Sequence, residues 1–109
     1  MKKISETDFA SEVIHKDGIR VVHFYNPYSD HSDANDTMLK ELYKNNNDVY
    51  FFYINLLHAE TLCERYGITL PSVLIFENGV LQDLLQGLVD KDGVENKLNS
   101  LADRFQGAA

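Results

Sequence analysis

Apolar residues occur along the chain in two alternating patterns. In residues 19–25 and 49–57 they follow one another with little interruption, which is typical of strands buried on both faces of a sheet. Elsewhere they recur at every third or fourth position, as in Met38, Leu39 and Leu42, which is typical of a helix with one buried face. Together the patterns predict strands at residues 1–4, 19–25, 49–57, 73–76 and 80–86, and helices near residues 7–17, 29–45, 59–66 and 92–105.

Short polar and glycine-containing sequences mark the ends of these elements. Gly67 is expected to cap the C-terminus of the third helix, and Asn78-Gly79 predicts a tight hairpin between two strands. Asp92, with a glutamate three positions later, predicts the N-cap of the last helix, whose apolar stripe runs to Phe105. The order β-α-β-α-β-α-β-β-α predicts an α/β fold with three layers, α/β/α. Its central sheet is mixed, with parallel pairing in the alternating part and an antiparallel edge from the hairpin.

Length and charge restrict the class of protein. The chain has 109 residues, which predicts a single domain over residues 1–109. Its formal net charge is −7 and its lysines are scattered, so we expect no binding to nucleic acid or to a membrane surface. No segment approaches the roughly 18 apolar residues of a membrane span. A single cysteine, Cys63, cannot form a disulfide within the chain, which favours a reducing compartment and predicts a cytoplasmic protein.

Two polar or reactive side chains are expected in the interior. His23 lies in the middle of a predicted strand, so we expect a neutral core histidine whose hydrogen bonds are satisfied. A pH-dependent effect of His23 on stability is the alternative. Cys63, the lone thiol, is interpreted as a small buried hydrophobic residue, with a redox-sensing or dimer-linking thiol as the alternative.

The first long strand ends at Asn26-Pro27, and a helix is expected to begin at Ser29-Asp30-His31-Ser32. The two serines are interpreted as a helix cap and a first-turn residue, beside carboxylates that favour the helix dipole. A serine nucleophile with His31 as its base is an alternative, although adjacent residues on one helical turn point apart. A metal site formed by His31, Asp30, Asp33 and Asp36 matches no common ligand spacing. We therefore expect no catalytic residue, no metal and no cofactor.

The same corner resembles that of the thioredoxin fold. Thioredoxin-fold oxidoreductases carry Cys-x-x-Cys here, and this sequence has Ser29 and Ser32 at the same spacing. Disulfide exchange needs a thiolate and a second sulfur, and serine supplies neither. Over roughly residues 21–90 the sequence is similar to the thioredoxin domain of the phosducin-like proteins. The matching residues are His23-Phe24-Tyr25, Asp36, Leu39, Leu42, Leu62-Cys63-Glu64-Arg65, Pro71, Asn78-Gly79 and Gly87.

This resemblance implies a redox-inactive thioredoxin-like protein. Ser29, Asp30, His31 and Ser32 would form the degenerate redox loop, and Pro71 would be the cis-proline of the family. Phosducin-like proteins are cytosolic and assist the chaperonin that folds actin and tubulin, and some bind G-protein βγ subunits. We therefore expect a co-chaperone or adaptor, with cytosolic chaperonin as one candidate partner. A protein or extended peptide would bind in the groove formed by Tyr28, Asp30, His31, Leu70 and Pro71.

The Ser-Asp-His-Ser sequence also resembles the Cys-Gly-His-Cys loop of protein disulfide isomerases. The alternative function is therefore a thiol-disulfide oxidoreductase, or a disulfide isomerase-like domain, whose two active-site cysteines were replaced by serine at Ser29 and Ser32. A purely structural role as a subunit of a larger assembly is a third alternative, and the sequence leaves all three open.

Overall fold

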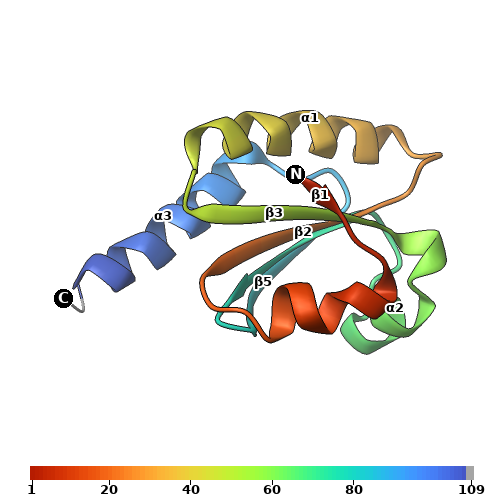
Figure 1. Ribbon diagram of the computed structural model, residues 1–109. Helices are drawn as coiled ribbons and strands as arrows, with labels where there is room; N and C mark the ends of the chain where they lie inside the picture. The colour runs from red at the N-terminus through yellow and green to blue at the C-terminus, as the bar shows by residue number, and fades with distance from the viewer. Residues whose placement is uncertain (108–109) are drawn as a thin grey trace.

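The structure is a computed structural model that describes the backbone of residues 1–107 and the side-chain surroundings of residues 1–102. The apolar stripe predicted for the last helix extends to Phe105, whose side chain lies outside the described residues. Within these limits the chain forms a five-stranded sheet covered by helices on both faces (Figure 1).

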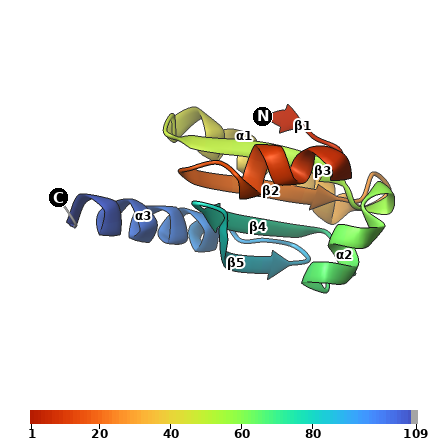
Figure 2. The same ribbon diagram turned by 60° about the horizontal axis from the view of Figure 1, so that its bottom comes forward.

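The strand at the centre of the sheet is one of the apolar runs that the sequence predicts to be buried. The order across the sheet is β1 (Lys2–Lys3), β3 (Val49–Asn55), β2 (Ile19–Tyr25), β4 (Ser72–Glu77) and β5 (Val80–Gln86) (Figure 2). β1, β3 and β2 are parallel, whereas β4 is antiparallel to both β2 and β5. Every residue of β2 from Ile19 to Phe24 is buried, because β2 has a strand on each side and a helical layer on each face.

Helices complete an arrangement of three layers. α1 (Asp30–Asn45) and α3 (Lys91–Gly107) cover one face of the sheet, and α2 (Glu60–Tyr66) and the N-terminal helical segment cover the other. The N-terminal segment and the end of β3 supply three short helices, η1 (Glu6–Asp8), η2 (Ala10–Ile14) and η3 (Leu56–His58). The predicted α/β fold with a mixed central sheet is confirmed. No helix in the part of the chain that the structure describes combines the length and apolar character needed to cross a membrane.

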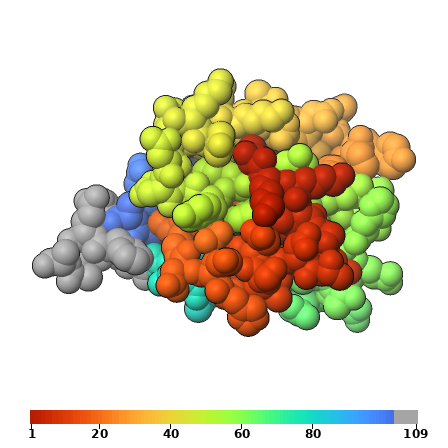
Figure 3. Space-filling view, in the orientation of Figure 1, coloured from red at the N-terminus to blue at the C-terminus, as the bar shows by residue number. Residues whose placement is uncertain are grey.

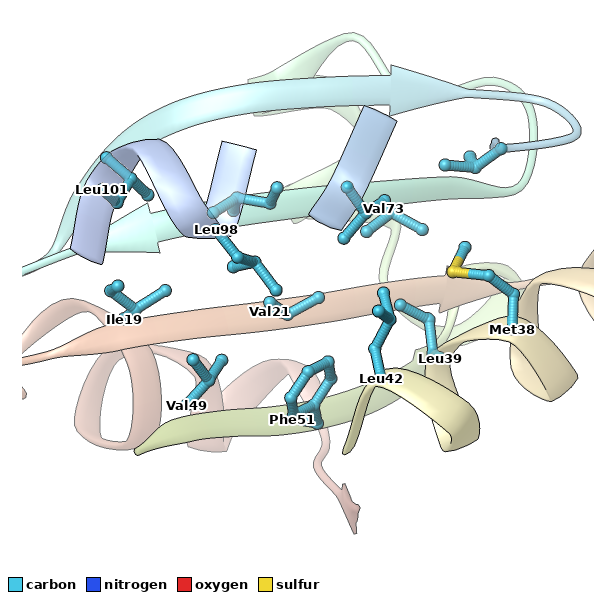
Figure 4. Packing of buried hydrophobic residues seen from close by; sticks show 13 residues of the cluster. Ile19, Val21, Met38, Leu39, Leu42, Val49, Phe51, Val73, Leu98 and Leu101 are labelled. Carbon is cyan, nitrogen blue, oxygen red and sulfur yellow. The ribbon is translucent and has the colours of Figure 1, made fainter. Parts of the chain in front are cut away.

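One apolar cluster lies on each face of the sheet. Leu39 of α1 and Leu98 of α3 belong to the first cluster, which also contains side chains of β2, β3 and β4 (Figure 4). In the second cluster, the ring of Phe9 packs edge-on against Phe24 and Phe76, with ring centroids 6.3 and 5.6 Å apart. Such aromatic pairs contribute roughly 0.5–1.5 kcal/mol each beyond the burial of their surface. The two clusters fix both helical layers to the sheet.

The pairing predicted for the alternating part of the chain is wrong for β4, which runs antiparallel to β2. α2 has seven residues, which is about 10 Å of helix. The seven residues of β3 are about 23 Å long. α2 is therefore too short to bring the chain back to the end of the sheet where β3 starts. β4 begins instead at the end of the sheet where β3 ends, and so runs in the opposite direction.

Local signals place most element ends correctly. Gly67 caps α2 with a φ of 68°, and the hairpin turn has a positive φ at both Asn78 (51°) and Gly79 (81°), as the sequence predicts. β3 ends two residues early, because the Asn55 side chain accepts a hydrogen bond from the Leu57 N–H and begins η3. The N-cap prediction for Asp92 is wrong. α3 begins at Lys91, so Asp92 lies in its first turn.

Candidate functional site

Asn26 fixes the corner between β2 and α1 with three hydrogen bonds. Its side-chain oxygen accepts from the Tyr28 N–H at 2.9 Å, and its carbonyl oxygen accepts from the Ser29 N–H at 3.0 Å. Its own N–H donates to Oγ of Ser32 at 2.7 Å. Pro27 restricts the backbone between these bonds. The corner is therefore a defined turn with Tyr28 at its tip, where the side chain is 88% exposed.

The two serines of the predicted degenerate loop have different surroundings. Ser29 occupies the N-cap position of α1, but its side chain makes no capping hydrogen bond. The Ser29 carbonyl oxygen instead accepts from the N–H groups of Ser32 and Asp33. Ser32 is only 3% exposed, and its hydroxyl oxygen accepts the hydrogen bond from the Asn26 N–H at the corner. Ser29 is therefore the N-cap residue and Ser32 a first-turn residue, as the sequence predicts, although the bonds at this end come from the Ser29 carbonyl oxygen and not from its hydroxyl.

Asp30 and His31 lie exposed in the first turn of α1. Among the described residues, no hydrogen bond joins His31 to Ser29 or Ser32. The same part of the chain contains no group of three or more His, Cys, Asp and Glu side chains that could hold a metal ion. This geometry supplies neither a base for a serine nucleophile nor a metal site at the corner.

Four exposed apolar side chains lie at the end of the sheet where α1 begins. Tyr28 follows β2, Leu57 follows β3, Leu70 precedes β4, and Leu88 follows β5. Their exposed fractions are 88, 49, 51 and 61%, respectively. We call these four residues the apical row. Figure 3 shows the start of α1 (orange) and the segment of η3 and α2 (green) at the same end of the molecule.

The strand register explains why the loops of the apical row lie side by side. Tyr25 at the end of β2 pairs with Asn55 at the end of β3. Ser72 at the start of β4 pairs with Phe24 on one side and Gln86 on the other. The four loops therefore leave from four adjacent strand ends. With about 4.8 Å between neighbouring strands, the row extends about 15 Å across the sheet.

A polar side chain fixes the backbone at each member of the apical row. Asn26 binds the N–H of Tyr28, and Asn55 binds the N–H of Leu57, both at 2.9 Å. The loop around Leu88 is held on both sides by one residue of α1. Asn35 Nδ2 donates to the Gly87 carbonyl oxygen, and Asn35 Oδ1 accepts from the Val89 N–H, both at 2.9 Å. The apical row is thus presented on constrained loops.

Hydrogen bonds also hold the backbone at Leu70 and Pro71. The carbonyl oxygen of Leu70 accepts from the Ser72 hydroxyl at 2.7 Å, and that of Pro71 accepts from the Gly87 N–H at 2.6 Å. No cis peptide bond occurs in the described part of the chain, so the bond between Leu70 and Pro71 is trans and the expected cis-proline is wrong. The trans isomer is the intrinsically favoured one, and the polar groups on both sides of Pro71 are satisfied in it.

A cavity of about 340 Å³ lies between the sheet and the first turns of α1. Side chains alternate along a strand, so His23 and Tyr25 face α1 together with the apolar residues of the first cluster. Near the start of α1 this face becomes polar. The cavity is lined by His23, Tyr25 and Tyr53 from the sheet, Asn26 and Pro27 from the corner, and Ser32, Asp33 and Asp36 from α1.

His23 is the most buried of these residues, with 1% of its surface exposed. Neither of its ring nitrogens has a hydrogen-bond partner, so the expectation of a satisfied core histidine is wrong. Its neighbours on β3 and β4, Tyr53 and Val73, pair with it through the backbone. Burial lowers the pKa of His23 from 6.5 to about 4, and the Asp36 carboxylate opposes this shift only in part. The imidazole is therefore neutral at pH 7.

Comparison with known proteins agrees with this architecture. The family model named Thioredoxin matches residues 1–100. The chain belongs to the thioredoxin family. It is also 30% identical over 105 residues to the thioredoxin domain-containing protein PLP3A of Arabidopsis thaliana. The match covers 92% of this chain and 45% of that relative, so the chain spans less than half of the relative's length. The similarity to the phosducin-like proteins is confirmed at this level.

The one cysteine of this thioredoxin-family chain lies on the other face of the sheet from α1. Cys63 lies on α2 and packs with the second cluster, on the face of the sheet opposite α1. It is partly buried, and its Sγ lies 3.5 Å from the Leu56 carbonyl oxygen, to which it donates. Burial, and then the charge of Glu6, raise the pKa of the Cys63 thiol. Both effects disfavour the reactive thiolate.

Asn35 and the two tyrosines that line the cavity were not predicted from the sequence. Asn35 is fully buried, three residues after Ser32 and three before Met38, on the inner face of α1. A polar residue at a core position of a helix is a signal that the sequence does carry. Tyr25 and Tyr53 gave no comparable signal, because an aromatic residue in a strand is ordinary.

Proposed function

We propose that this thioredoxin-family protein is a redox-inactive binding protein that holds a segment of another protein against the apical row and the degenerate loop. One observation carries the proposal. Serines stand where a redox pair would act, and constrained loops beside them expose four large apolar side chains. Single exposed apolar residues are common, whereas a group of them in one place marks an interaction surface.

The predicted groove can be refined from the positions of its residues. Tyr28, Asp30, His31 and Leu70 are exposed, whereas Pro71 is buried and cannot contact a partner directly. The surface therefore combines apolar contacts with acidic ones. Because its loops are already held in place, little conformational entropy is lost on binding. An extended segment with apolar anchors and flanking basic residues is the complementary partner.

The relationship to phosducin-like proteins supports a role as a co-chaperone or adaptor in the cytoplasm. Cytosolic chaperonin is the candidate partner that this relationship suggests. The single cysteine favours a reducing compartment. Because the chain spans 45% of the relative's length, the proposal concerns only contacts made by this domain.

Quantitative affinity capture tests the proposal. The wild-type chain and the Tyr28→Ala/Leu70→Ala variant are used as bait, and chaperonin subunits and other captured proteins are measured. Two central apolar contacts are worth several kcal/mol at an interface, so capture of specific partners should fall by about tenfold or more. Val80→Ala removes a side chain that is 61% exposed at the opposite end of β5, and serves as the control. Equal capture by the double variant would exclude this surface.

The oxidoreductase alternative keeps one supporting observation. Ser29 and Ser32 have the Cys-x-x-Cys spacing at the start of α1, and a helix N-terminus is where a thiolate is stabilised. An insulin-reduction assay separates the two functions. We expect no turnover by the unaltered chain. We expect only slow turnover by Ser29→Cys/Ser32→Cys, because Asp33 and Asp36 would oppose a thiolate. Efficient turnover by that variant, with cysteine codons in the native gene, would favour the alternative.

A further inference from the structure

Arg20 is a buried cation that no acidic side chain neutralises. It lies near the start of β2 and is 7% exposed. Its Nη2 donates to the Asp17 carbonyl oxygen at 3.2 Å, but in the described part of the chain no carboxylate forms an ion pair with it. An arginine is rarely buried to this extent unless it is paired, because an unpaired buried charge is costly. The fold therefore leaves the charge of Arg20 without a counter-charge.

The Arg20 side chain extends over the neighbouring strand β3 into a groove of about 700 Å³. Its guanidinium carbon lies 4.2 Å from the centre of the Tyr50 ring and 5.8 Å from that of Phe52, both on β3. Nε has almost no accessible surface, so no ligand can reach it. Nη1 also makes no hydrogen bond, but it is not enclosed in this way. Nη1 is therefore the donor that Arg20 presents to the groove.

The groove is positively charged, although the chain as a whole has a formal net charge of −7. Lys2 and Lys16 line it together with Arg20, and Glu12 is the one acidic residue among its described lining residues. Glu12 is already paired with Lys2, whose Nζ lies 3.0 Å from its Oε1. The charges of Arg20 and Lys16 remain. A guanidinium group and an ammonium group both donate to oxyanions, so the groove favours an anionic ligand.

An open strand edge beside the groove indicates the form of that ligand. β1 pairs only with Phe52 and Tyr53 of β3, so in the described chain residues 49–51 have no strand beside them on that side (Figure 1). An extended peptide can add to such an edge through its backbone. Tyr43 and Tyr50, which are 48 and 54% exposed, line the same groove and provide apolar contacts. A nucleic acid fits less well, because it would extend beyond this small patch over a chain of negative net charge.

We propose that this groove binds an acidic, extended segment of a partner protein, with carboxylates on Arg20 and Lys16 and the backbone along the open edge of β3. The groove lies at the end of the sheet where β2 and β3 begin, whereas the apical row lies at the end where these strands finish. This binding goes beyond the proposed function and does not depend on the apical row, so each surface can fail while the other stands.

Chemical-shift titration with a capped eight-residue peptide of alternating threonine and glutamate tests the groove. The matched ligand has glutamine in place of each glutamate, so it keeps the shape without the charge. We expect saturable amide shifts at Arg20, Tyr50 and Phe51, and at least tenfold weaker binding of the glutamine peptide. Arg20→Met should weaken binding of the acidic peptide by about tenfold, the factor for loss of one charge-assisted hydrogen bond. Lys16→Gln should weaken it by about threefold, because exposed ion pairs are weaker.

Control variants locate the binding. Arg65→Met removes an exposed arginine of α2 outside the groove and should leave binding unchanged. Tyr28→Ala/Leu70→Ala should also bind the acidic peptide fully, which separates the groove from the apical row. Lys16 is exposed, so Lys16→Gln should fold even if Arg20→Met does not. Equal binding of the glutamine peptide, full binding by either folded groove variant, loss of binding in the apical-row variant, or tighter binding of an eight-nucleotide oligothymidine would overturn the proposal.

Discussion

At the scale of single residues, His23 links the cavity to the stability of the fold. Its pKa is about 4 in the folded chain and 6.5 when exposed, so the unfolded chain binds more protons between these values. The free energy of unfolding should therefore fall as the pH decreases from about 6.5 to about 4, with the full contribution present above 6.5. For one group this loss amounts to about 3 kcal/mol.

Urea unfolding of the wild-type and His23→Leu chains across this pH range measures that contribution. The variant should lose less stability than the wild type by about 3 kcal/mol over the whole interval. Asp33 and Asp36 line the same cavity and are present in both chains, so the difference between the two profiles isolates the histidine. His15→Gln, at an exposed histidine, is the control and should keep the wild-type profile. Identical profiles for wild type and His23→Leu would contradict the assignment.

Asn35 holds the loop that carries Leu88, a member of the apical row. Asn35→Ala leaves the Gly87 carbonyl and the Val89 N–H without partners. The expected decrease in the free energy of unfolding is about 2–4 kcal/mol, from two lost hydrogen bonds in a buried setting. Asn45→Ala, at an exposed position of the same helix, should change it by less than about 0.5 kcal/mol. A small effect of Asn35→Ala would mean that the loop at Leu88 is not held from α1.

At the scale of elements, the β4–β5 hairpin is fixed at its turn by the N-terminal layer. Asn78 exchanges hydrogen bonds with Gly18, through its side chain and its N–H. A Cβ atom on Gly79 would overlap the carbonyl oxygen of Ile14 in η2, whereas a Cβ atom on Gly67 would meet no atom. Both glycines have positive φ, so they differ mainly in available space.

These two glycines provide a matched pair of substitutions. Gly67→Ala introduces only left-handed backbone strain, about 1–2 kcal/mol. Gly79→Ala adds a steric conflict with backbone atoms that cannot rotate away, so it should decrease the free energy of unfolding by at least about 1 kcal/mol more. Thermal or urea unfolding compares the two variants directly. Equal losses would show that the hairpin moves away from η2 without penalty.

Some elements of the fold could be predicted from the sequence and others could not. The buried central strand, the cap at Gly67 and the turn at Asn78-Gly79 were predictable, because each depends on neighbouring residues alone. The direction of β4 was not, because it depends on the length of α2 relative to β3. The cavity at His23 was not predictable either. It exists because β2, β3 and α1 bring polar side chains from distant positions to one place.

At the scale of the whole molecule, the end of the sheet where α1 begins carries the features that point to function. The apical row, residues 29–32 and the cavity all adjoin the corner or neighbouring strand ends. The opposite end carries the hairpin turn and the start of β3. The fold thus holds several loops from adjacent strands in a fixed arrangement, without a reactive sulfur among them.

Site-specific photo-crosslinking tests the central claim, that a protein partner occupies this end of the sheet. A photoreactive phenylalanine derivative replaces Tyr28 in one chain and Val80, exposed at the far end of β5, in another. Both chains are irradiated in an extract of the native cells. We predict discrete cross-linked products from position 28, suppressed by excess unlabelled wild-type chain, and none from position 80. Products from position 80 alone, or none that the wild-type chain suppresses, would contradict the claim.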